Sequence, residues 1–380
     1  MNNNNQLIPK LRFPEFEDSG DWEQIQLGSI CELYQPQTLS ASQLNLKGSY
    51  DVYGANGIIG KHDSFNHEFS EVVVTCRGAT CGEVHRTNPK SWITGNAMVV
   101  KPKSNSITSN YLFQYFKMDG LKSVVSGSAQ PQITRAGFSP FLIWLPKEEE
   151  QKEIADCLSS IDELIGAEGQ KLYALKRHKK GLMQQLFPAK GQTTPTLRFP
   201  EFEESKEWEE SFLGKCCKMT TGKLDANAMV ENGKYRFYTC AKDYFKINEY
   251  AFDTDALLIS GNGANVGYIH HYNGKFNAYQ RTYVLDKFTQ EITFIKYFLE
   301  KNLHLRISTE KKDGNTPYIV MSTLTEMPVN LPNLVEQLLI ANFLTSIDSL
   351  INDQTHKIEA LKNHKKGLMQ QLFPSLEEVA

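Results

Sequence analysis

The chain has 380 residues, 40% of them hydrophobic and 22% charged, which excludes a disordered or fibrous protein and predicts two or three ordinary domains. Its formal net charge is −3. This near-neutral balance excludes DNA binding by bulk positive charge, so any DNA contact must come from a placed minority of Lys and Arg or be shared with a basic partner.

The cysteines and the apolar runs indicate the compartment. The seven cysteines lack the paired spacing of a disulfide framework, and Cys76 and Cys81 have no second pair that would complete a zinc site. We therefore expect reduced thiols. No run approaches the roughly 18 apolar residues of a membrane span, and the first residues lack the features of a signal peptide. These patterns predict a cytoplasmic protein.

A fifteen-residue string occurs twice, 186 positions apart. ALKRHKKGLMQQLFP at 174–188 and ALKNHKKGLMQQLFP at 360–374 differ at one position. The same offset relates PKLRFPEFEDSGDWEQIQLG at 9–28 to PTLRFPEFEESKEWEESFLG at 195–214, whereas the stretches between have little in common. A period this long corresponds to one or two domains rather than to a solenoid repeat. The chain is predicted to be a duplicated unit. The two copies share the repeated strings and differ in the stretches between them.

Residues 1–146 are predicted to form a first α+β module. Short β-prone runs, EVVVT at 71–75 and AMVV at 97–100, alternate with turn signals such as ANG at 55–57. No phosphate loop, dinucleotide fingerprint, HExxH helix or GxSxG elbow occurs here or elsewhere in the chain. The nine histidines have no acidic or cysteine neighbours at metal-ligand spacing. We expect neither a metal site nor catalysis by this chain.

Residues 147–188 are predicted to form a long helix. It begins after Leu145-Pro146 and stops at Pro188, where proline cannot continue a helix. About 40 residues correspond to a rod of about 60 Å. Apolar residues fill eight slots of a 3.5-residue repeat, the pattern of a helix that packs as a coiled coil. The slots hold Ile154, Leu158, Ile161, Ile165, Leu172, Leu175, Leu182 and Leu186.

The second half repeats this order. A polar linker at 189–196 leads to a second α+β module at 197–332, with the β-prone runs ALLI at 256–259 and RTYVL at 281–285. A second helix at 333–374 fills the same eight slots, and a short tail covers 375–380. The slots hold Ile340, Leu344, Ile347, Ile351, Ile358, Leu361, Leu368 and Leu372.

Two equal apolar seams in one chain can satisfy each other, so we expect an antiparallel pair of helices with a pseudo-twofold axis and a module at either end. Each seam is interrupted at two polar positions. Pairing these interruptions predicts a register that places Glu168 beside Lys365 and Lys179 beside Gln354. The fold class is thus α+β, with two globular domains separated by two long antiparallel helices.

Three pairs of equivalent loops are candidates for ligand contact. Their Arg and Asn side chains are the types that bind guanine and adenine edges in the major groove, and their amides and lysines suit base and phosphate contact. Tight strand connections or merely solvated loops are the alternative interpretation. The candidates are Arg77 and Thr80 with Asn262 and Asn265; Gln130, Gln132 and Arg135 with Lys311, Lys312 and Asn315; and Gln280 with Arg281, which correspond to Gly95 and Asn96.

The duplicated helix end contains residues that the seam does not explain. Leu182 and Leu186 fill seam slots, but their retained neighbours do not, which indicates a second surface used once per half. Two related copies suit a pair of identical partner subunits. The predicted partner-binding residues are Met183, Gln184, Gln185, Phe187, Met369, Gln370, Gln371 and Phe373.

Together, the duplicated LRFPEF…W…LG segment, the EQxxIA helix start (clear at 150–155, weaker at 336–341) and the LKxHKKGLMQQLFP helix end resemble the specificity subunit of type I restriction-modification systems. The resemblance covers nearly the whole chain. It implies two target recognition domains that each read one half of a bipartite DNA site, and two helices that set the spacing. It assigns no catalytic residue to this subunit.

The resemblance also implies partners and their cofactors. Two methyltransferase subunits would bring S-adenosylmethionine, and restriction subunits would use ATP and Mg²⁺, so no cofactor is expected on this chain. Two alternatives stay open: the recognition subunit of a fused restriction-modification enzyme, and, in a different class, a coiled-coil scaffold with two ligand-binding modules.

Overall fold

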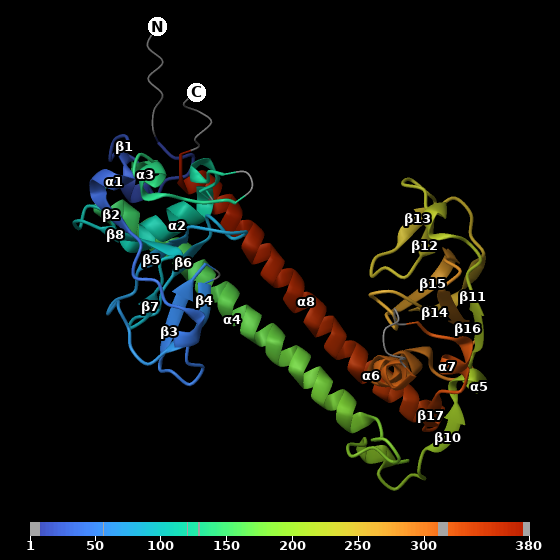
Figure 1. Ribbon diagram of the computed structural model, residues 1–380. Coiled ribbons are helices and arrows are strands. Elements are labelled where there is room, and N and C mark those ends of the chain that lie inside the picture. The colour runs from blue at the N-terminus through green and yellow to red at the C-terminus, as the bar shows by residue number, and fades with distance from the viewer. Residues whose placement is uncertain (1–7, 56, 120, 128–129, 311–317, 375–380) are drawn as a thin grey trace. The chain divides into compact units, whose positions relative to one another are not determined.

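The computed structural model describes residues 8–55, 57–119, 121–127, 130–310 and 318–374. The chain divides into two compact units. Unit 1 comprises Met1–Gln170 and His356–Ala380, and unit 2 comprises Lys171–Thr355 (Figure 1). Each unit therefore contains one module together with a part of each long helix.

In unit 1 the strands form a four-stranded sheet in the order β2-β8-β5-β6, a three-stranded sheet β4-β3-β7, and the pair β1-β9. Short helices α1 (Leu27–Ile30) and α3 (Arg135–Phe138) and the longer α2 (Ser109–Asp119) connect them. The strands are β1 (Glu23–Gln26), β2 (Cys31–Tyr34), β3 (Tyr50–Gly54), β4 (Gly57–His62), β5 (Val72–Thr75), β6 (Val84–Arg86), β7 (Trp92–Ile93), β8 (Ala97–Pro102) and β9 (Leu142–Leu145). Single 3₁₀ turns lie at η1 (Pro14–Phe16), η2 (Ala41–Gln43) and η3 (Lys122–Val124).

The central strand β5 is buried on both faces, which explains its continuous run of valines. Successive side chains of a strand point to opposite faces. Val72 and Val74 accordingly join the large core with α2, whereas Val73 packs with Ile93 and Val99 in a second, smaller core. The predicted β-prone runs at 71–75 and 97–100 are confirmed as strands.

Unit 2 joins the equivalent strands into one six-stranded sheet, in the order β11-β16-β14-β15-β12-β13, beside the pair β10-β17. Helix α6 (Ile292–Glu310) covers one face of this sheet, and α5 (Leu213–Cys216) and α7 (Met321–Thr325) are short (Figure 1). The strands are β10 (Glu209–Phe212), β11 (Lys218–Thr221), β12 (Tyr235–Tyr238), β13 (Phe245–Ile247), β14 (Phe252–Ser260), β15 (Ile269–Ala278), β16 (Thr282–Asp286) and β17 (Pro328–Leu331). The 3₁₀ turns are η4 (Pro200–Phe202) and η5 (Ala226–Ala228).

The long helices are α4 (Glu148–Leu186) and α8 (Leu334–Leu372), and both lie within the predicted segments. Every one of the sixteen predicted seam residues is buried or half-buried, so the predicted seam is confirmed. Helix α8 is also long and apolar enough, by length and composition alone, to pass as a membrane span, and it is the one such helix among the described residues. Its most apolar part, including Ile340 and Leu344, packs in the core of unit 2.

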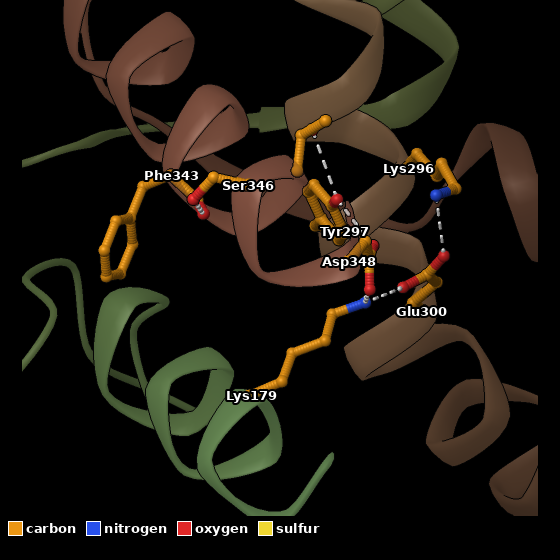
Figure 2. Close-up of polar contacts among 8 residues, drawn as sticks. Lys179, Lys296, Tyr297, Glu300, Phe343, Ser346 and Asp348 are labelled. Carbon is orange, nitrogen blue, oxygen red and sulfur yellow. Dashed lines mark hydrogen bonds and ion pairs between the residues drawn. The ribbon is translucent and has the colours of Figure 1, made fainter. Parts of the chain in front are cut away.

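The helices run antiparallel within each unit, but the predicted register is wrong. In unit 1, Lys365 binds Asp162 (Nζ to Oδ2, 2.6 Å), and Glu168 pairs with Lys357 rather than with Lys365. In unit 2, Lys179 binds Asp348 (Nζ to Oδ1, 2.6 Å) rather than facing Gln354 (Figure 2). Each lysine in the seam thus lies beside a carboxylate. The predicted register would have given a carboxylate to Lys365 alone and the neutral Gln354 to Lys179, whereas the observed register gives a carboxylate to both lysines.

The duplicated segment that contains Trp22 in unit 1 and Trp208 in unit 2 anchors the start of each long helix. In unit 1, the Arg12 guanidinium makes two hydrogen bonds with the carboxylate of Glu150, at 2.8 and 2.7 Å, and the Trp22 indole donates to the same carboxylate at 3.3 Å. Unit 2 repeats this arrangement with Arg198, Trp208 and Glu336; the corresponding distances are 2.8, 2.8 and 3.3 Å.

The glutamines that follow these glutamates hold the adjacent chain. Gln151 and Gln337 are fully buried. The Gln151 side chain donates to the carbonyl of Pro146 and accepts from the amide of Thr108, and Gln337 makes the same bonds to Pro332 and Glu291. The repeated Arg, Trp, Glu and Gln therefore serve the fold, since they fix each module to the start of the helix that follows it.

Candidate nucleic-acid interface

In unit 1 the three candidate segments meet at one surface. The Gly-rich turn after β5 pairs its backbone with the segment before α3, through a bridge between Arg77 and Gln132 and a hydrogen bond from the Ile133 amide to the Cys76 carbonyl (2.9 Å). The Cys76 amide in turn donates to the carbonyl of Asn96 (3.0 Å). Segments that are far apart in the sequence are thus held within hydrogen-bonding distance of one another.

Unit 2 builds the same frame from different residues. The amide of Ile319 donates to the carbonyl of Gly261, and the amide of Gly261 donates to the carbonyl of Arg281, both at 2.8 Å. Asn262 forms a bridge with Tyr318, as Arg77 does with Gln132. These segments surround a pocket of about 270 Å³, which is lined by Gly261, Gln280, Arg281, Tyr283 and Ile319.

The two Gly-rich turns have one backbone shape. Gly78 (φ +88°) and Gly82 (φ +92°) in unit 1 correspond to Gly263 (φ +81°) and Gly267 (φ +82°) in unit 2. This left-handed region is one that glycine adopts without steric penalty, which explains why both turns keep glycine at these positions. The turns therefore present different side chains from the same scaffold.

A fourth segment joins this surface, and sequence reasoning missed its role. The Asn265 side chain donates to the carbonyl of Cys240 (3.0 Å), in the loop between β12 and β13. In unit 1, the Thr80 hydroxyl donates to the carbonyl of Ala55 (2.7 Å), at the equivalent place after β3. The signal in the sequence was a turn that follows a YxxY strand in both halves, at Tyr50–Tyr53 and Tyr235–Tyr238.

The predicted DNA-binding residues differ in their availability. Arg77, Gln130, Gln132, Arg135, Gln280 and Arg281 are exposed. Thr80 and Asn265 are partly buried, and their side chains are engaged with the neighbouring loop, so they position that loop. Gln280 also donates to Asp225 (2.7 Å). Lys311, Lys312 and Asn315 lie outside the described residues.

Aromatic and cationic side chains continue the surface of unit 2 beyond the Cys240 loop. The Arg236 guanidinium lies between the rings of Tyr244 and Tyr272, at 4.3 and 4.4 Å from their centroids. Tyr244 and Tyr268 are 41% and 39% exposed, enough to offer ring faces to a ligand. Stacking on aromatic faces combined with nearby positive charge is a common way to bind nucleic acid bases.

Burial changes the pKa of groups that support this surface. The pKa of His270 is lowered, first by burial, and its Nε2 lies 3.0 Å from the carbonyl of Ala241 in the Cys240 loop. Burial also raises the pKa of Tyr283, whose hydroxyl donates to the carbonyl of Ile319 (2.7 Å). Both groups are therefore neutral near pH 7 and act as hydrogen-bonding supports. No cluster of three potential metal ligands is found in the described part of the chain.

The duplicated helix ends divide into buried and exposed residues. Phe187 packs on Trp208 and Phe294, and Phe373 packs on Trp22, Tyr111 and Tyr115. Both phenylalanines and Met369 are buried in the cores of their own units, so the prediction that they contact a partner is corrected for these three. Gln184, Gln185, Gln370 and Gln371 are exposed, and Met183 is half-buried.

A protein-family model matches the chain twice, and the two matches cover most of its length. Residues 19–177 and residues 205–363 each match the model of the type I restriction modification DNA specificity domain. The chain belongs to this family. The resemblance inferred from the repeated motifs is confirmed, as are the fold class and the function of a DNA specificity subunit of a type I restriction-modification system.

Individual relatives agree with the family. The chain is 27% identical over 415 aligned residues to the type I restriction enzyme MjaVIII specificity subunit of Methanocaldococcus jannaschii, a match that covers 96% of this chain and 93% of that protein. It is 38% identical over 164 residues to the type I restriction enzyme EcoDI specificity subunit of Escherichia coli, across 43% of this chain and 36% of that protein.

Two solved structures share the fold. The S subunit of a type I restriction-modification system from M. genitalium matches with a TM-score of 0.71 and 17% identity, over 97% of this chain and 100% of that one. A chain from a structural study of complex assembly and conformational transition of the type I R-M system matches with a TM-score of 0.56 and 16% identity, over 93% and 98% of the two chains.

Proposed function

We propose that each unit reads one half of a bipartite duplex DNA site. The observation that carries this proposal is the pair of equivalent four-segment surfaces, which share hydrogen bonds and glycine geometry but present different side chains. Two surfaces with the same backbone but different side chains suit a target whose two halves have different sequences. We take residues 1–146 and 197–332 as the recognition domains and residues 147–188 and 333–374 as the helices that set the half-site spacing.

The exposed residues have three proposed roles. Arg77 and Arg281 are suited to bidentate contact with guanine, and Gln132 and Gln280 are suited to adenine. Arg135, at the start of α3, is placed for phosphate contact. Each good bidentate contact is worth about 1–3 kcal/mol of discrimination against the wrong base. A few such contacts give specificity without the strong positive charge that this chain lacks.

The remaining chemistry is assigned to partners. We propose that two methyltransferase subunits dock on the exposed glutamines of the duplicated helix ends, at Gln184, Gln185, Gln370 and Gln371. These subunits bring S-adenosylmethionine, restriction subunits bring ATP and Mg²⁺, and this subunit recognises DNA without catalysing a reaction. Such a complex works in the cytoplasm, where its DNA target is found.

Enrichment of random duplexes by the full-length chain, with and without a co-expressed methyltransferase subunit, tests this function. We expect a two-part motif with a fixed gap. Arg281→Ala should weaken the base preference at one position of one half-site and leave the other half-site unchanged. The free energy that discriminates the right base from the wrong one at that position should fall by about 1–3 kcal/mol. Arg86→Ala, at an exposed arginine of unit 1 outside the proposed surface, is the control. Failure to enrich any sequence in either condition would reject DNA reading in favour of a scaffold that binds other ligands.

A further inference from the structure

A hydrogen bond between two exposed side chains lies beside the polar pocket of unit 2. The amide nitrogen Nε2 of Gln280 donates to Oδ1 of Asp225 at 2.7 Å. Gln280 lines the pocket, in the turn between β15 and β16. Asp225 lies 55 residues earlier, directly before the 3₁₀ turn η5. The contact therefore joins a proposed base-reading side chain to a segment that sequence reasoning did not single out.

The backbone holds these two segments together. The amide of Gln280 donates to the carbonyl of Leu224 (2.9 Å), the residue before the aspartate. The amide of Gly222 donates to the carbonyl of Thr282 (3.2 Å), on the far side of the same turn. A Cβ at position 222 would overlap the carbonyl oxygen of Ala278, so glycine permits this close approach. Both side chains of the pair thus start from fixed positions.

The usual role of an aspartate at this place does not account for Asp225. Aspartate before a helical turn commonly accepts a hydrogen bond from a backbone amide of that turn. The Asp225 side chain makes no such capping bond with the described turn Ala226–Ala228. A carboxylate on a DNA-reading surface also repels phosphate, so it does not serve affinity. The interaction that accounts for its placement is the hydrogen bond with Gln280.

The carboxylate decides which end of the Gln280 amide faces outward. An ionised carboxylate only accepts hydrogen bonds, so the NH₂ group of the amide faces Asp225. This bond uses one of the two amide hydrogens. In the described part of the chain no other hydrogen bond engages the amide, so the oxygen Oε1 and the second hydrogen are available to a ligand. Adenine presents the matching pair in the major groove, a donor at N6 and an acceptor at N7.

We propose that Asp225 is a positioning residue for base recognition by unit 2, because it holds the Gln280 amide in the orientation that reads adenine. The inference rests on the proposed function, in which Gln280 contacts a base. Guanine presents acceptors at both N7 and O6, so an amide held in this way places its oxygen against an acceptor and rejects guanine. Asp225 thus determines specificity through Gln280 rather than by touching a base.

Unit 1 has the equivalent backbone without this pair. Gly95 occupies the place of Gln280, and Ser40 precedes η2 as Asp225 precedes η5. The Ser40 hydroxyl donates to the side chain of Gln43 within its own turn (2.8 Å). Glycine offers no side chain to orient. The oriented amide is therefore a feature of unit 2, and its loss should leave the half-site of unit 1 unchanged.

Base preference at one position tests the proposal. The full-length chain, with its co-expressed methyltransferase subunit, is offered its enriched duplex in competition with duplexes changed at single positions. Gln280→Ala identifies the position that Gln280 reads, which we expect to be an adenine. At that position Asp225→Asn should lower the preference for adenine over guanine at least about fivefold. The new amide can donate to Oε1 and turn the NH₂ group of Gln280 toward the base.

Affinity for non-target duplex separates orientation from a merely structural role. Asp225→Asn removes a negative charge beside the DNA, so this affinity should rise about twofold or more at low salt while discrimination falls. Asp225→Glu keeps a group that only accepts and should keep the adenine preference within about threefold. Glu231→Gln removes an exposed charge from the same connection between β11 and β12. This control should leave the preference unchanged.

Four results would overturn the proposal. They are an unchanged preference in Asp225→Asn, weaker binding of target and non-target duplex alike in that variant, equal losses of preference in Asp225→Asn and Asp225→Glu, and a position other than adenine in the Gln280→Ala experiment. If the wild-type chain enriches a two-part motif and Asp225→Asn reads it unchanged, the inference fails and the function stands. If the wild-type chain enriches no sequence, the function fails and the inference fails with it.

Discussion

The Arg–Trp–Glu anchors and the proposed recognition loops are both duplicated, but in opposite ways. The anchors keep residue identity and hydrogen bonds, so that Arg12, Trp22 and Glu150 are repeated as Arg198, Trp208 and Glu336. The loops keep the backbone bonds and glycine positions but exchange the side chains, such as Arg77 for Asn262. The difference teaches that the frame depends on specific side chains, whereas the proposed DNA-reading surface depends on a main-chain scaffold on which the side chains differ between the two units.

The anchor should show the largest effect. Glu150→Ala leaves the Arg12 guanidinium buried without its counter-charge, and breaking a buried pair in this way costs about 3–5 kcal/mol. Urea unfolding of the full-length chain measures the loss. Glu149→Ala, at an exposed neighbour in the same helical turn, should cost less than about 0.5 kcal/mol. Two equal unfolding curves would mean that the anchor does not hold the frame.

Truncation of a buried leucine in the helix seam should have the next largest effect on stability. Leu344 is fully buried, and Leu344→Ala removes apolar contacts and leaves a cavity at a cost of about 2–5 kcal/mol. Leu350 on the same helix is 55% exposed, and Leu350→Ala is expected to be nearly neutral. The same unfolding measurement compares them. A destabilisation by Leu350→Ala as large as that by Leu344→Ala would show that the seam is placed on the wrong face.

Loss of the hydrogen bond from Asn265 to the Cys240 loop should have a smaller and local effect on stability. Asn265→Ala removes the hydrogen bond to Cys240, a loss of about 0.5–1.5 kcal/mol, and should speed amide hydrogen exchange within Thr239–Tyr244. Thr80→Ala should act in the same way on the segment after β3. Asn262→Ala, three residues away on the same turn, is the control and should alter DNA preference rather than exchange.

Lowering the pH should have the smallest effect of the four changes, and it should act on the same Cys240 loop. The pKa of His270 is lowered in the folded protein, so the unfolded state binds the proton more readily. The contribution of neutral His270 is therefore complete above its unfolded pKa of about 6.5 and is lost as the pH falls toward the folded value. DNA binding by unit 2 and exchange within 239–244 should show this dependence, and His270→Gln should reduce it. An unchanged pH profile in that variant would exclude His270 as the cause.

Several features could be predicted from the sequence because their causes are local or repetitive. The seam of Leu158, Leu182 and Leu344 follows from a 3.5-residue pattern, and the Gly-rich turns follow from glycine at the start of a loop after a β-prone run. The repeat gave the equivalence of the two halves and, through it, the three pairs of candidate loops. The convergence of these loops on one surface was not predicted, because it depends on backbone contacts between segments that are distant in the chain.

The errors have a common physical origin. The register was predicted from the gaps in the seams, but Asp162 and Asp348, which lie beside those gaps, decided it by binding the lysines. Phe187 and Phe373 lie off the seam and looked like a partner surface, because the sequence does not show that each module covers the end of a helix. Both errors concern contacts between segments that are distant in the chain.

The sequence by itself determined the duplication, the two long helices, their apolar faces and the membership of the family, since each of these is written as a period or a repeated string. Only the tertiary structure decided which side chains became supports, as Thr80 and Asn265 did, and which stayed exposed, as Arg77 and Arg281 did. The reason is that burial and charge balance depend on neighbours brought together by folding, and no period in the sequence records them.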